Sequence, residues 1–287
     1  MEFCARGRII DGVASILILL SLGSLAAAQS PKPDSNYLRN IELCNGQDRT
    51  SLEPQINGCT SLIVSGKHPT AVLAIAYNNR GNAYVSKGDY DRALRDFDQS
   101  IKLNPTYSKP FNNRGVAYLK RGQYDLAIKA LDEAIKLNPG YAGAFANRAE
   151  VYQKNHEYDR AARDYDEAIR LDPDLQAVWS GRCWVRAIVG ALQAALEDCN
   201  KALQLAPSDA ATYDSRGLIY LKMGQLNAAI DDYDSALRFE PKLASALYGR
   251  GLAKLRSGDK AGSDTDISAA KTIQAKIGDN FTRYGVN

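Results

Sequence analysis

Cysteine is the residue type whose spacing points most directly to chemistry in this 287-residue chain. Cys4 precedes an apolar segment, and the remaining four are Cys44, Cys59, Cys183 and Cys199. If the apolar segment directs export, these four cysteines would lie in an oxidising compartment. An even number of cysteines there suggests that they pair. Joining Cys44 to Cys59 would close a short loop and constrain the unfolded chain by roughly 3 kcal/mol. We therefore expect a disulfide between Cys44 and Cys59.

The second pair, Cys183 and Cys199, leaves two interpretations open. These residues either form a disulfide or remain two buried thiols that pack as small hydrophobic groups. Neither pair has the close ligand spacing of a zinc site, and the only histidines, His68 and His156, lie far from both pairs in sequence. We expect no metal site and no cofactor.

No combination of residues is typical of a catalytic site. The histidines have no neighbouring nucleophile motif, and the sequence contains neither a glycine-rich phosphate loop nor a cluster of metal ligands. The formal net charge is +3, which is too small to indicate the concentrated basic surface that nucleic-acid binding requires. The sequence therefore predicts a protein that is not an enzyme and does not bind nucleic acid.

Arginine and aspartate recur with a fixed period and could bind an anion or pair with each other. The arginines are Arg80, Arg114, Arg148, Arg182, Arg216 and Arg250. The aspartates are Asp96, Asp164, Asp198, Asp232 and Asp266. Because the two series match in period and oppose in charge, we favour ion pairs between packed helices over an anion-binding ridge. Ala130 interrupts the aspartates, so Arg114 should find Glu133 or another acceptor, or be more exposed.

The elements that must position these residues are pairs of helices. In residues 77–105, aromatic and small residues recur at spacings of four and three on both sides of Gly88, which places each set on one helix face. Gly88 can end the first helix, Asp89 can cap the second, and Pro105 marks where the second helix stops. The segment therefore predicts a helical hairpin, which cannot bury both of its sides alone.

Copies of this hairpin follow with a 34-residue period. The first aromatic position is occupied in turn by Tyr77, Phe111, Phe145, Trp179, Tyr213 and Leu247. The turn prolines keep the same step at Pro105, Pro139, Pro173, Pro207 and Pro241. This pattern resembles the tetratricopeptide repeat. The resemblance implies an all-α fold, a right-handed superhelical solenoid of antiparallel helix pairs with about six repeats, an amino-terminal half-repeat and a carboxy-terminal capping helix.

The expected boundaries follow from the 34-residue period. They are a signal peptide at 1–28, a flexible or irregular segment at 29–51, a capping half-repeat at 52–73, repeats at 74–107, 108–141, 142–175, 176–209 and 210–243, a degenerate sixth repeat with its cap at 244–277, and a tail at 278–287. The cap is expected to cover Leu247, Leu252, Leu255 and Ile267.

The amino terminus resembles a secretory signal peptide. Arg6 and Arg8 precede an apolar run at 13–25, and three alanines follow, which indicates cleavage between Ala28 and Gln29. We expect a protein exported to the periplasm or secreted, with no membrane insertion after cleavage. The alternative is an uncleaved membrane anchor, although the run is short for an ordinary transmembrane helix.

The resemblance also implies a partner-binding site, because repeats of this kind commonly bind a peptide or partner protein on the concave surface of their first helices. The candidate residues there are Asn78, Asn79, Asn82, Asn112, Asn113, Lys120, Asn147, Glu150, Trp184, Ile188 and Leu218. The polar members can hydrogen-bond to a peptide backbone, and Trp184 is the expected aromatic anchor. In the alternative interpretation, Trp184 and Ile188 pack against the adjacent repeat.

Basic residues along the same surface mildly favour an acidic partner. They include Lys109, Lys120, Lys154, Lys222 and Arg256. We therefore expect a non-catalytic interaction module that binds a protein or peptide. Because fold alone does not fix the ligand, a structural scaffold or assembly factor of an envelope complex without a peptide groove remains the alternative.

Overall fold

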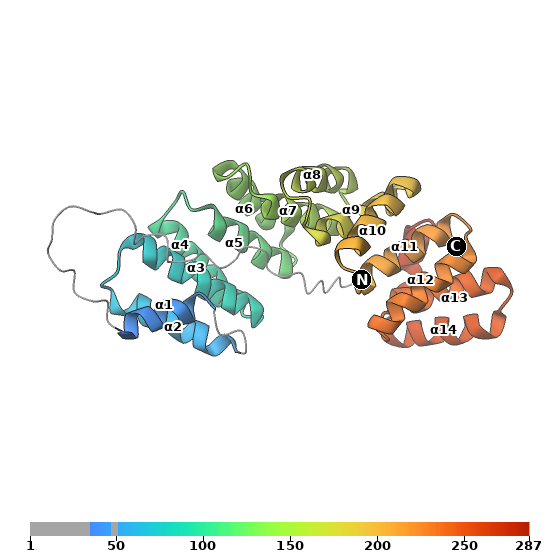
Figure 1. Ribbon diagram of the computed structural model, residues 1–287, viewed down its shortest axis with the longest axis horizontal. Coiled ribbons are helices and arrows are strands. Elements are labelled where there is room, and N and C mark those ends of the chain that lie inside the picture. Colours follow the sequence, from blue (N-terminus) through green and yellow to red (C-terminus); the bar gives the residue numbers. More distant parts are fainter. Residues whose placement is uncertain (1–34, 47–50, 287) are drawn as a thin grey trace. The chain divides into compact units, whose positions relative to one another are not determined.

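The computed structural model describes residues 35–46 and 51–286, and this part of the chain is helical (Figure 1). It contains fifteen α-helices and no strand within the described ranges. The helices are α1 (Ser35–Cys44), α2 (Leu52–Ser65), α3 (Thr70–Ser86), α4 (Tyr90–Leu103), α5 (Ser108–Lys120), α6 (Tyr124–Leu137), α7 (Ala142–Lys154), α8 (Tyr158–Leu171), α9 (Gln176–Val189), α10 (Leu192–Leu205), α11 (Ala210–Lys222), α12 (Leu226–Phe239), α13 (Ala244–Ser257), α14 (Lys260–Ile273) and α15 (Ile277–Arg283). The predicted all-α class is confirmed.

Two predictions for the amino terminus fall outside this description. The expected signal peptide at 1–28 lies entirely outside the described residues, as does the start of the segment at 29–51. Among the residues that are described, none of the helices has the length and apolar character needed to cross a membrane.

The helices pack in consecutive pairs that keep the predicted period. α3 packs against α4, α5 against α6, α9 against α10, α11 against α12 and α13 against α14. The second helices α4, α6, α8, α10 and α12 start at Tyr90, Tyr124, Tyr158, Leu192 and Leu226, each one full repeat after the one before. The described chain forms two compact units, residues 35–151 and residues 152–286, and the boundary falls inside α7.

The turn inside each pair depends on one backbone position. Just after the first helix of these pairs one residue has a φ between 71° and 94°, and it is Gly88, Gly122, Gly190, Gly224 or Gly258. Glycine reaches this left-handed conformation without steric cost, so it ends the first helix. Asp89 then begins the next helix, where its side chain accepts a hydrogen bond of 3.1 Å from the Arg92 amide. The predicted roles of Gly88 and Asp89 are confirmed.

A small residue beneath a large one sets the distance between paired helices. A Cβ added to Gly81 would lie 2.6 Å from the Phe97 ring, so only glycine permits this approach, and Phe97 is fully buried. The fourth repeat has Cys183 and Cys199 at the equivalent positions, with their sulfur atoms 1.91 Å apart. A cysteine pair at disulfide distance therefore replaces the packing of glycine against an aromatic ring.

The recurring arginines form ion pairs with the recurring aspartates, as predicted. Arg182 on α9 donates to both carboxylate oxygens of Asp198 on α10, at 2.9 Å and 2.6 Å. Its remaining nitrogen, Nη1, donates to Asp166 on α8 at 2.6 Å. Each contact spans 16 residues, one forward and one backward along the chain. One guanidinium therefore connects its own second helix to the second helix before it.

The same geometry recurs in both units. The bidentate pairs are Arg80 with Asp96, Arg216 with Asp232, and Arg250 with Asp266. Hydrogen bonds to Asp232 raise the pKa of Arg216, which keeps this guanidinium charged. The structural interpretation of the arginines is confirmed.

Arg114 lacks a bidentate partner of this kind, as expected from Ala130 at the aspartate position. Its Nη1 donates to Asp98 on α4 at 2.9 Å, so the arginine finds another acceptor in the preceding helix pair. Its Nε is buried and has no hydrogen-bond partner among the described residues. Because Ala130 replaces the aspartate, one half of the bridge is missing in the second repeat.

The amino-terminal end contains a helix that the sequence did not predict. α1 lies within the segment expected to be irregular and packs against α2, so a pair of helices precedes the first full repeat. The sulfur atoms of Cys44 on α1 and Cys59 on α2 lie 2.06 Å apart, and both residues are fully buried. Cysteines at disulfide distance therefore hold this first pair together.

The carboxy-terminal end also differs in part from expectation. Leu247 and Leu252 are each 9% exposed, and Ile267 on α14 is partly buried against the core that contains them. Leu255 is 49% exposed, so its predicted burial is wrong. It lies in the last turn of α13 beside the exposed turn to α14. A further helix, α15, follows in the predicted tail.

We predict that Ala130→Asp stabilises the first unit by about 1 kcal/mol, because the new carboxylate can accept the unused Nε–H of Arg114. Asp96 occupies the equivalent position with a bidentate arginine, so the backbone geometry suits the substitution. Urea unfolding followed by circular dichroism measures the change. In an Arg114→Leu background the same substitution should destabilise, because it buries an unpaired carboxylate. Equal effects in the two backgrounds would contradict the pairing.

Candidate partner-binding surface

The predicted partner-binding residues lie on the first helices of the repeats. One position recurs once in each repeat as Asn82, Val116, Glu150, Trp184, Leu218 and Leu252, and we call this set the central row. The first unit holds its first three members and the second unit holds the other three. The central row therefore changes from mixed polarity in the first unit to entirely apolar in the second.

In the first unit, asparagines link successive first helices. Asn147 donates to Asn112 at 2.8 Å, and Asn112 donates to Asn113 at 3.1 Å. Asn113 donates to Asn78 at 2.9 Å. The chain of amides continues from Asn78 to Asn79 at 3.2 Å, and from Asn79 to Asn45 at 3.4 Å. These six residues, Asn45, Asn78, Asn79, Asn112, Asn113 and Asn147, form what we call the amide row.

The amide row lies mostly beneath the surface. Asn78 and Asn79 are 0% exposed, and Asn112 and Asn113 are 2% exposed. Their side chains were predicted to face a partner, but the structure places them where they hydrogen-bond across neighbouring repeats. A buried amide whose partners are all protein groups stabilises the stack and costs free energy when one partner is removed. The sequence did not single out Asn45, although it occupies the position of Asn79 one repeat earlier.

Other predicted polar residues of the first unit are more accessible. Lys120 on α5 and Glu150 on α7 form an ion pair of 3.9 Å, with side chains 42% and 33% exposed. An exposed pair of this kind contributes little to stability, so both groups can exchange it for a ligand. Asn82 is only 7% exposed. Lys120 and Glu150 are therefore the predicted charged residues that a partner can reach in this unit.

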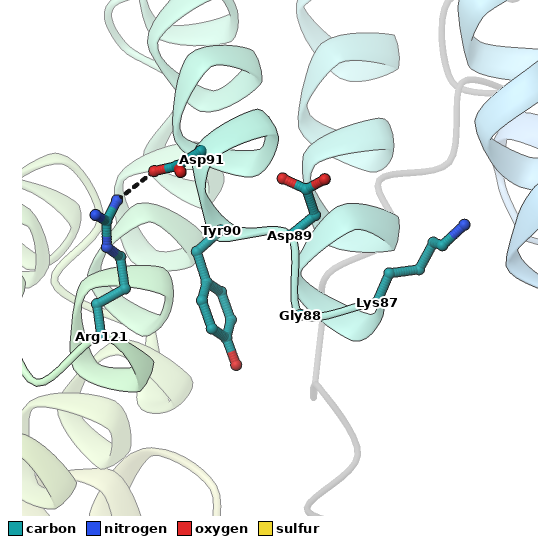
Figure 2. A pocket seen from close by; sticks show the side chains of 6 residues that line it. All are labelled: Lys87, Gly88, Asp89, Tyr90, Asp91 and Arg121. Atoms are coloured by element: carbon teal, nitrogen blue, oxygen red, sulfur yellow. Dashed lines mark hydrogen bonds and ion pairs between the residues drawn. The ribbon is translucent and has the colours of Figure 1, made fainter.

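A shallow hollow of about 420 Å³ lies at the turn between α3 and α4 (Figure 2). Its lining includes Tyr90, Asp89 and the ion pair of Arg121 with Asp91, whose atoms are 2.6 Å apart. Lys87 at its edge pairs with Glu53, and Asp89 caps α4. These charged groups already have partners, so the hollow has the character of a solvated turn.

In the second unit, Trp184 on α9 is covered by other aromatic rings. It is 6% exposed, and its ring meets those of Tyr158 and Tyr284 edge-on, with both centroid distances 5.8 Å. Leu218 is 3% exposed, and Ile188 is partly buried against the same core. Tyr158 belongs to the preceding repeat, whereas Tyr284 comes from the end of the chain.

The cover is supplied by residues 277–286, which we call the C-terminal segment. It consists of α15 and the three residues that follow. Ile277, Phe281 and Val286 are 0%, 2% and 3% exposed and share one core with Leu218 and Leu252. The sequence was expected to form a tail here, although Phe281 stands one full repeat after Leu247 and was a signal that the repeat pattern continues.

A carboxyl group lies in the same region. Asp214 on α11 is 5% exposed and accepts a hydrogen bond of 2.7 Å from Ser245 on α13. Burial raises the pKa of Asp214 to about 7, and the nearby Glu240 adds to the effect. Burial also raises the pKa of Tyr284 to about 12. Asp214 is therefore neutral below about pH 7, and Tyr284 stays neutral at physiological pH.

Metal binding has no candidate in the part of the chain that the structure describes. No group of three or more histidine, cysteine, aspartate or glutamate side chains there is arranged to hold an ion. The expected absence of a cofactor and of catalytic residues stays a prediction.

Models of one protein family match the chain in two regions. The model described as "Tetratricopeptide repeat" matches residues 74–107, 108–141 and 142–175, and the one described as "TPR repeat" matches residues 217–258. Together the matched residues make up half of the chain. A comparison with curated protein sequences gives no significant match.

Solved structures share the fold at low sequence identity. A chain of the APC/C hetero-tetramer Cut9-Hcn1 superposes with a TM-score of 0.70 at 18% identity over 85% of this chain, which spans only 48% of that one. A tetratricopeptide repeat protein from Parabacteroides merdae gives 0.64 at 18% identity and covers 88% of this chain and 100% of its own. YrrB, described as a TPR protein with an unusual peptide-binding site, gives 0.51 at 20%, with 62% and 92% covered.

We predict that Asn113→Ala lowers the free energy of unfolding of the first unit by about 1–3 kcal/mol, since it removes one buried hydrogen-bond partner from each of Asn78 and Asn112. Urea unfolding followed by circular dichroism measures the loss. Asn57→Ala is the control, because Asn57 is exposed on α2 and should change stability by less than about 0.5 kcal/mol. A loss no larger than the control's would show that the amide row adds no stability.

We predict that the second unit loses stability as the pH rises from about 4 to 7. In the folded state the pKa of Asp214 is about 7, whereas an ordinary aspartate has a pKa of 3.8. Over this pH interval the folded state therefore binds more protons than the unfolded state. Between pH 5 and pH 7 the free energy of unfolding should fall by up to about 2 kcal/mol more than in Asp214→Asn. Tryptophan fluorescence during urea unfolding reports this unit, which contains both tryptophans. Parallel pH profiles would contradict the assignment.

Proposed function

Since the chain belongs to the tetratricopeptide repeat family, we propose that it is a non-catalytic protein-binding module whose partner, a peptide or a folded protein, binds the surface formed by the first helices. The observation that carries this proposal is the central row. In the second unit it is Trp184, Leu218 and Leu252, three large apolar side chains at one repeated position. Buried aromatic and aliphatic anchors contribute most of the affinity in protein interfaces.

The first unit has polar and charged groups of its own that can contact a partner. Lys120 is exposed, Glu150 is half-buried, and their ion pair is weak, so a partner can replace that contact with its own. The position of Lys120 is occupied in later repeats by Lys154, Lys222 and Arg256. This run of cations supports an acidic partner, because complementary charge speeds association and helps to select a partner. YrrB offers a precedent for peptide binding by this fold, at low sequence identity.

The alternative is a structural scaffold without a peptide groove. One observation favours it, namely that Trp184 and Leu218 are covered by the C-terminal segment. In a scaffold that cover would be permanent, and partners would bind elsewhere on the molecule. The two proposals therefore differ in which surface a partner contacts.

We also propose that the protein works outside the cytoplasm. Two cysteine pairs lie at disulfide distance, at Cys44 with Cys59 and at Cys183 with Cys199. Disulfides persist in oxidising compartments and are rare in the cytosol. The signal-like sequence at 1–28 supports the same proposal.

Site-specific cross-linking tests the partner surface. A photo-cross-linking amino acid is placed singly at Lys120 and at Ile188 on first helices, and at the exposed Lys129 and Asp231 on second helices. We expect one and the same protein to be captured from both first-helix sites and from neither second-helix site. Mass spectrometry identifies the captured protein, and circular dichroism confirms that each variant is folded.

A charge reversal refines the same test. Lys120→Glu should weaken binding of the captured partner several-fold, mainly through slower association, whereas Lys129→Glu should leave it unchanged. Capture from the second-helix sites alone would contradict the proposal and favour the scaffold. Stronger binding by Lys120→Glu would contradict the acidic character of the partner.

A further inference from the structure

The apolar half of the central row lies in the core beside the C-terminal segment in the second unit, and we call the apolar surface that this segment covers the groove. Trp184 lies on α9, Leu218 on α11 and Leu252 on α13, so three consecutive first helices each contribute one large side chain. Their exposed fractions are only 6%, 3% and 9%. In the first unit the same positions carry Asn82, Val116 and Glu150. The groove is therefore a feature of this unit and not of the repeat in general.

The C-terminal segment fills this groove with one face of a short amphipathic helix. Ile277, Phe281, Tyr284 and Val286 turn toward the core, whereas Asp279, Thr282 and Arg283 lie on the outer side. The Phe281 ring lies 4.9 Å from that of Tyr248 on α13, and the Tyr284 ring lies 5.8 Å from that of Trp184. The inward side chains of the helix follow one another at spacings of four and three residues, which is the pattern of a helix bound in a groove.

The C-terminal segment has fewer stabilising contacts than the helix pairs of the repeats. α15 has seven residues, which is too short for a helix to be stable without tertiary contacts. It packs against α13, and the hydrogen bonds of Arg283 run to Asp279 and Asn280 within the segment itself. Local opening is easiest for an element with few stabilising contacts, and α15 is such an element. Departure of the segment therefore does not require the repeats to unfold.

We propose that the C-terminal segment is a removable occupant of this groove, and that the groove takes in its place a short helical segment of a partner protein with large apolar or aromatic side chains at its first, fifth and eighth positions. The proposal rests on the proposed function and specifies its partner. The partner's helix would contact Trp184 and Tyr248, whose rings the chain's own segment now meets, and Leu218 in the same core. The exposed face of that helix can be acidic, in agreement with the basic residues along the groove.

Because the C-terminal segment is attached to the chain, it competes strongly with a free peptide for the groove. A tethered ligand acts at an effective concentration on the order of millimolar, so a free copy of the same sequence competes poorly while the segment is intact. The apparent affinity of any ligand falls in proportion to the fraction of protein whose groove is open. Weakening the segment should therefore raise the affinity for a free peptide and leave the groove itself unchanged.

The experiment uses the full chain with Trp179→Phe, which leaves Trp184 as the single tryptophan. Phe281→Ala combined with Tyr284→Ala releases the segment, and Thr282→Ala combined with Arg283→Ala is the matched control on its exposed face. The probe is a synthetic peptide of residues 275–286, AKIGDNFTRYGV. Release should shift the emission of Trp184 to the red and increase its quenching by acrylamide. Addition of the peptide should reverse both changes.

We expect the peptide to bind the released variant at least tenfold more tightly than the control variant or the otherwise unsubstituted chain. A peptide with alanine in place of Phe281 and Tyr284 should bind neither. Equal affinity for the released and control variants would overturn the proposal, as would a released variant that binds no peptide. If the released variant dimerises and rejects the peptide, the occupant is a second copy of the chain and the proposed partner is wrong.

Hydrogen exchange of the unsubstituted chain provides a test that depends on no variant. Amides of residues 278–284 should exchange at least tenfold faster than those in the middle of α13, and exchange as slow as that of α13 would overturn the proposal. Failure of either test leaves the proposed function standing if Lys120 and Ile188 still cross-link a partner. Capture from the second-helix sites alone would instead refute the proposed function, whatever the peptide does.

Discussion

A buried guanidinium that contacts two second helices at once is the interaction on which the arrangement of the repeats depends. Arg182, Arg216 and Arg250 each reach 16 residues forward and 16 residues back, as Arg182 does to Asp198 and Asp166. Both contacts require a fixed distance along the chain, so a residue inserted or deleted between Arg182 and Asp198 would break a charged pair whose carboxylate is shielded from solvent. Breaking such a pair costs about 3–5 kcal/mol. The constancy of the 34-residue period follows from this constraint.

The two units join their first helices by different chemistry. In the first unit the position of Asn79, Asn113 and Asn147 continues the amide row, which is polar and directional. In the second unit the equivalent residues are Gly181, Ser215 and Gly249. There the rings of Tyr165 and Tyr233 come so close that a Cβ on Gly181 or Gly249 would clash with them. Apolar packing replaces the amides and leaves an apolar central row beside it.

The repeat architecture could be predicted because its determinants are local or periodic. Gly88 and Asp89 define a turn by themselves, and arginines matched to aspartates in period indicate pairing without any knowledge of the fold. The burial of the asparagines could not be predicted, because Asn78 meets Asn113, 35 residues away, only once the repeats stack. α1 was missed although Tyr37, Ile41 and Cys44 show the spacing of a repeat helix. The cover over Trp184 was missed because the register of Phe281 indicates another helix but does not indicate that this helix packs against Trp184, about 100 residues earlier in the chain.

In the binding mode that we propose, stacking and ligand binding use the same kinds of apolar side chain. Phe281 and Gly285 keep the 34-residue register of Leu247 and Gly251, so the segment is similar in sequence to the start of a first helix. It nevertheless lies over Trp184, Leu218 and Tyr248. A groove that accepts a repeat-like helix gains affinity from apolar area but little selectivity, because large apolar side chains of similar size bind it almost equally well. Selection among partners must therefore come from the polar groups around it, such as Asp214 and Lys222, which favour some exposed faces of a bound helix over others.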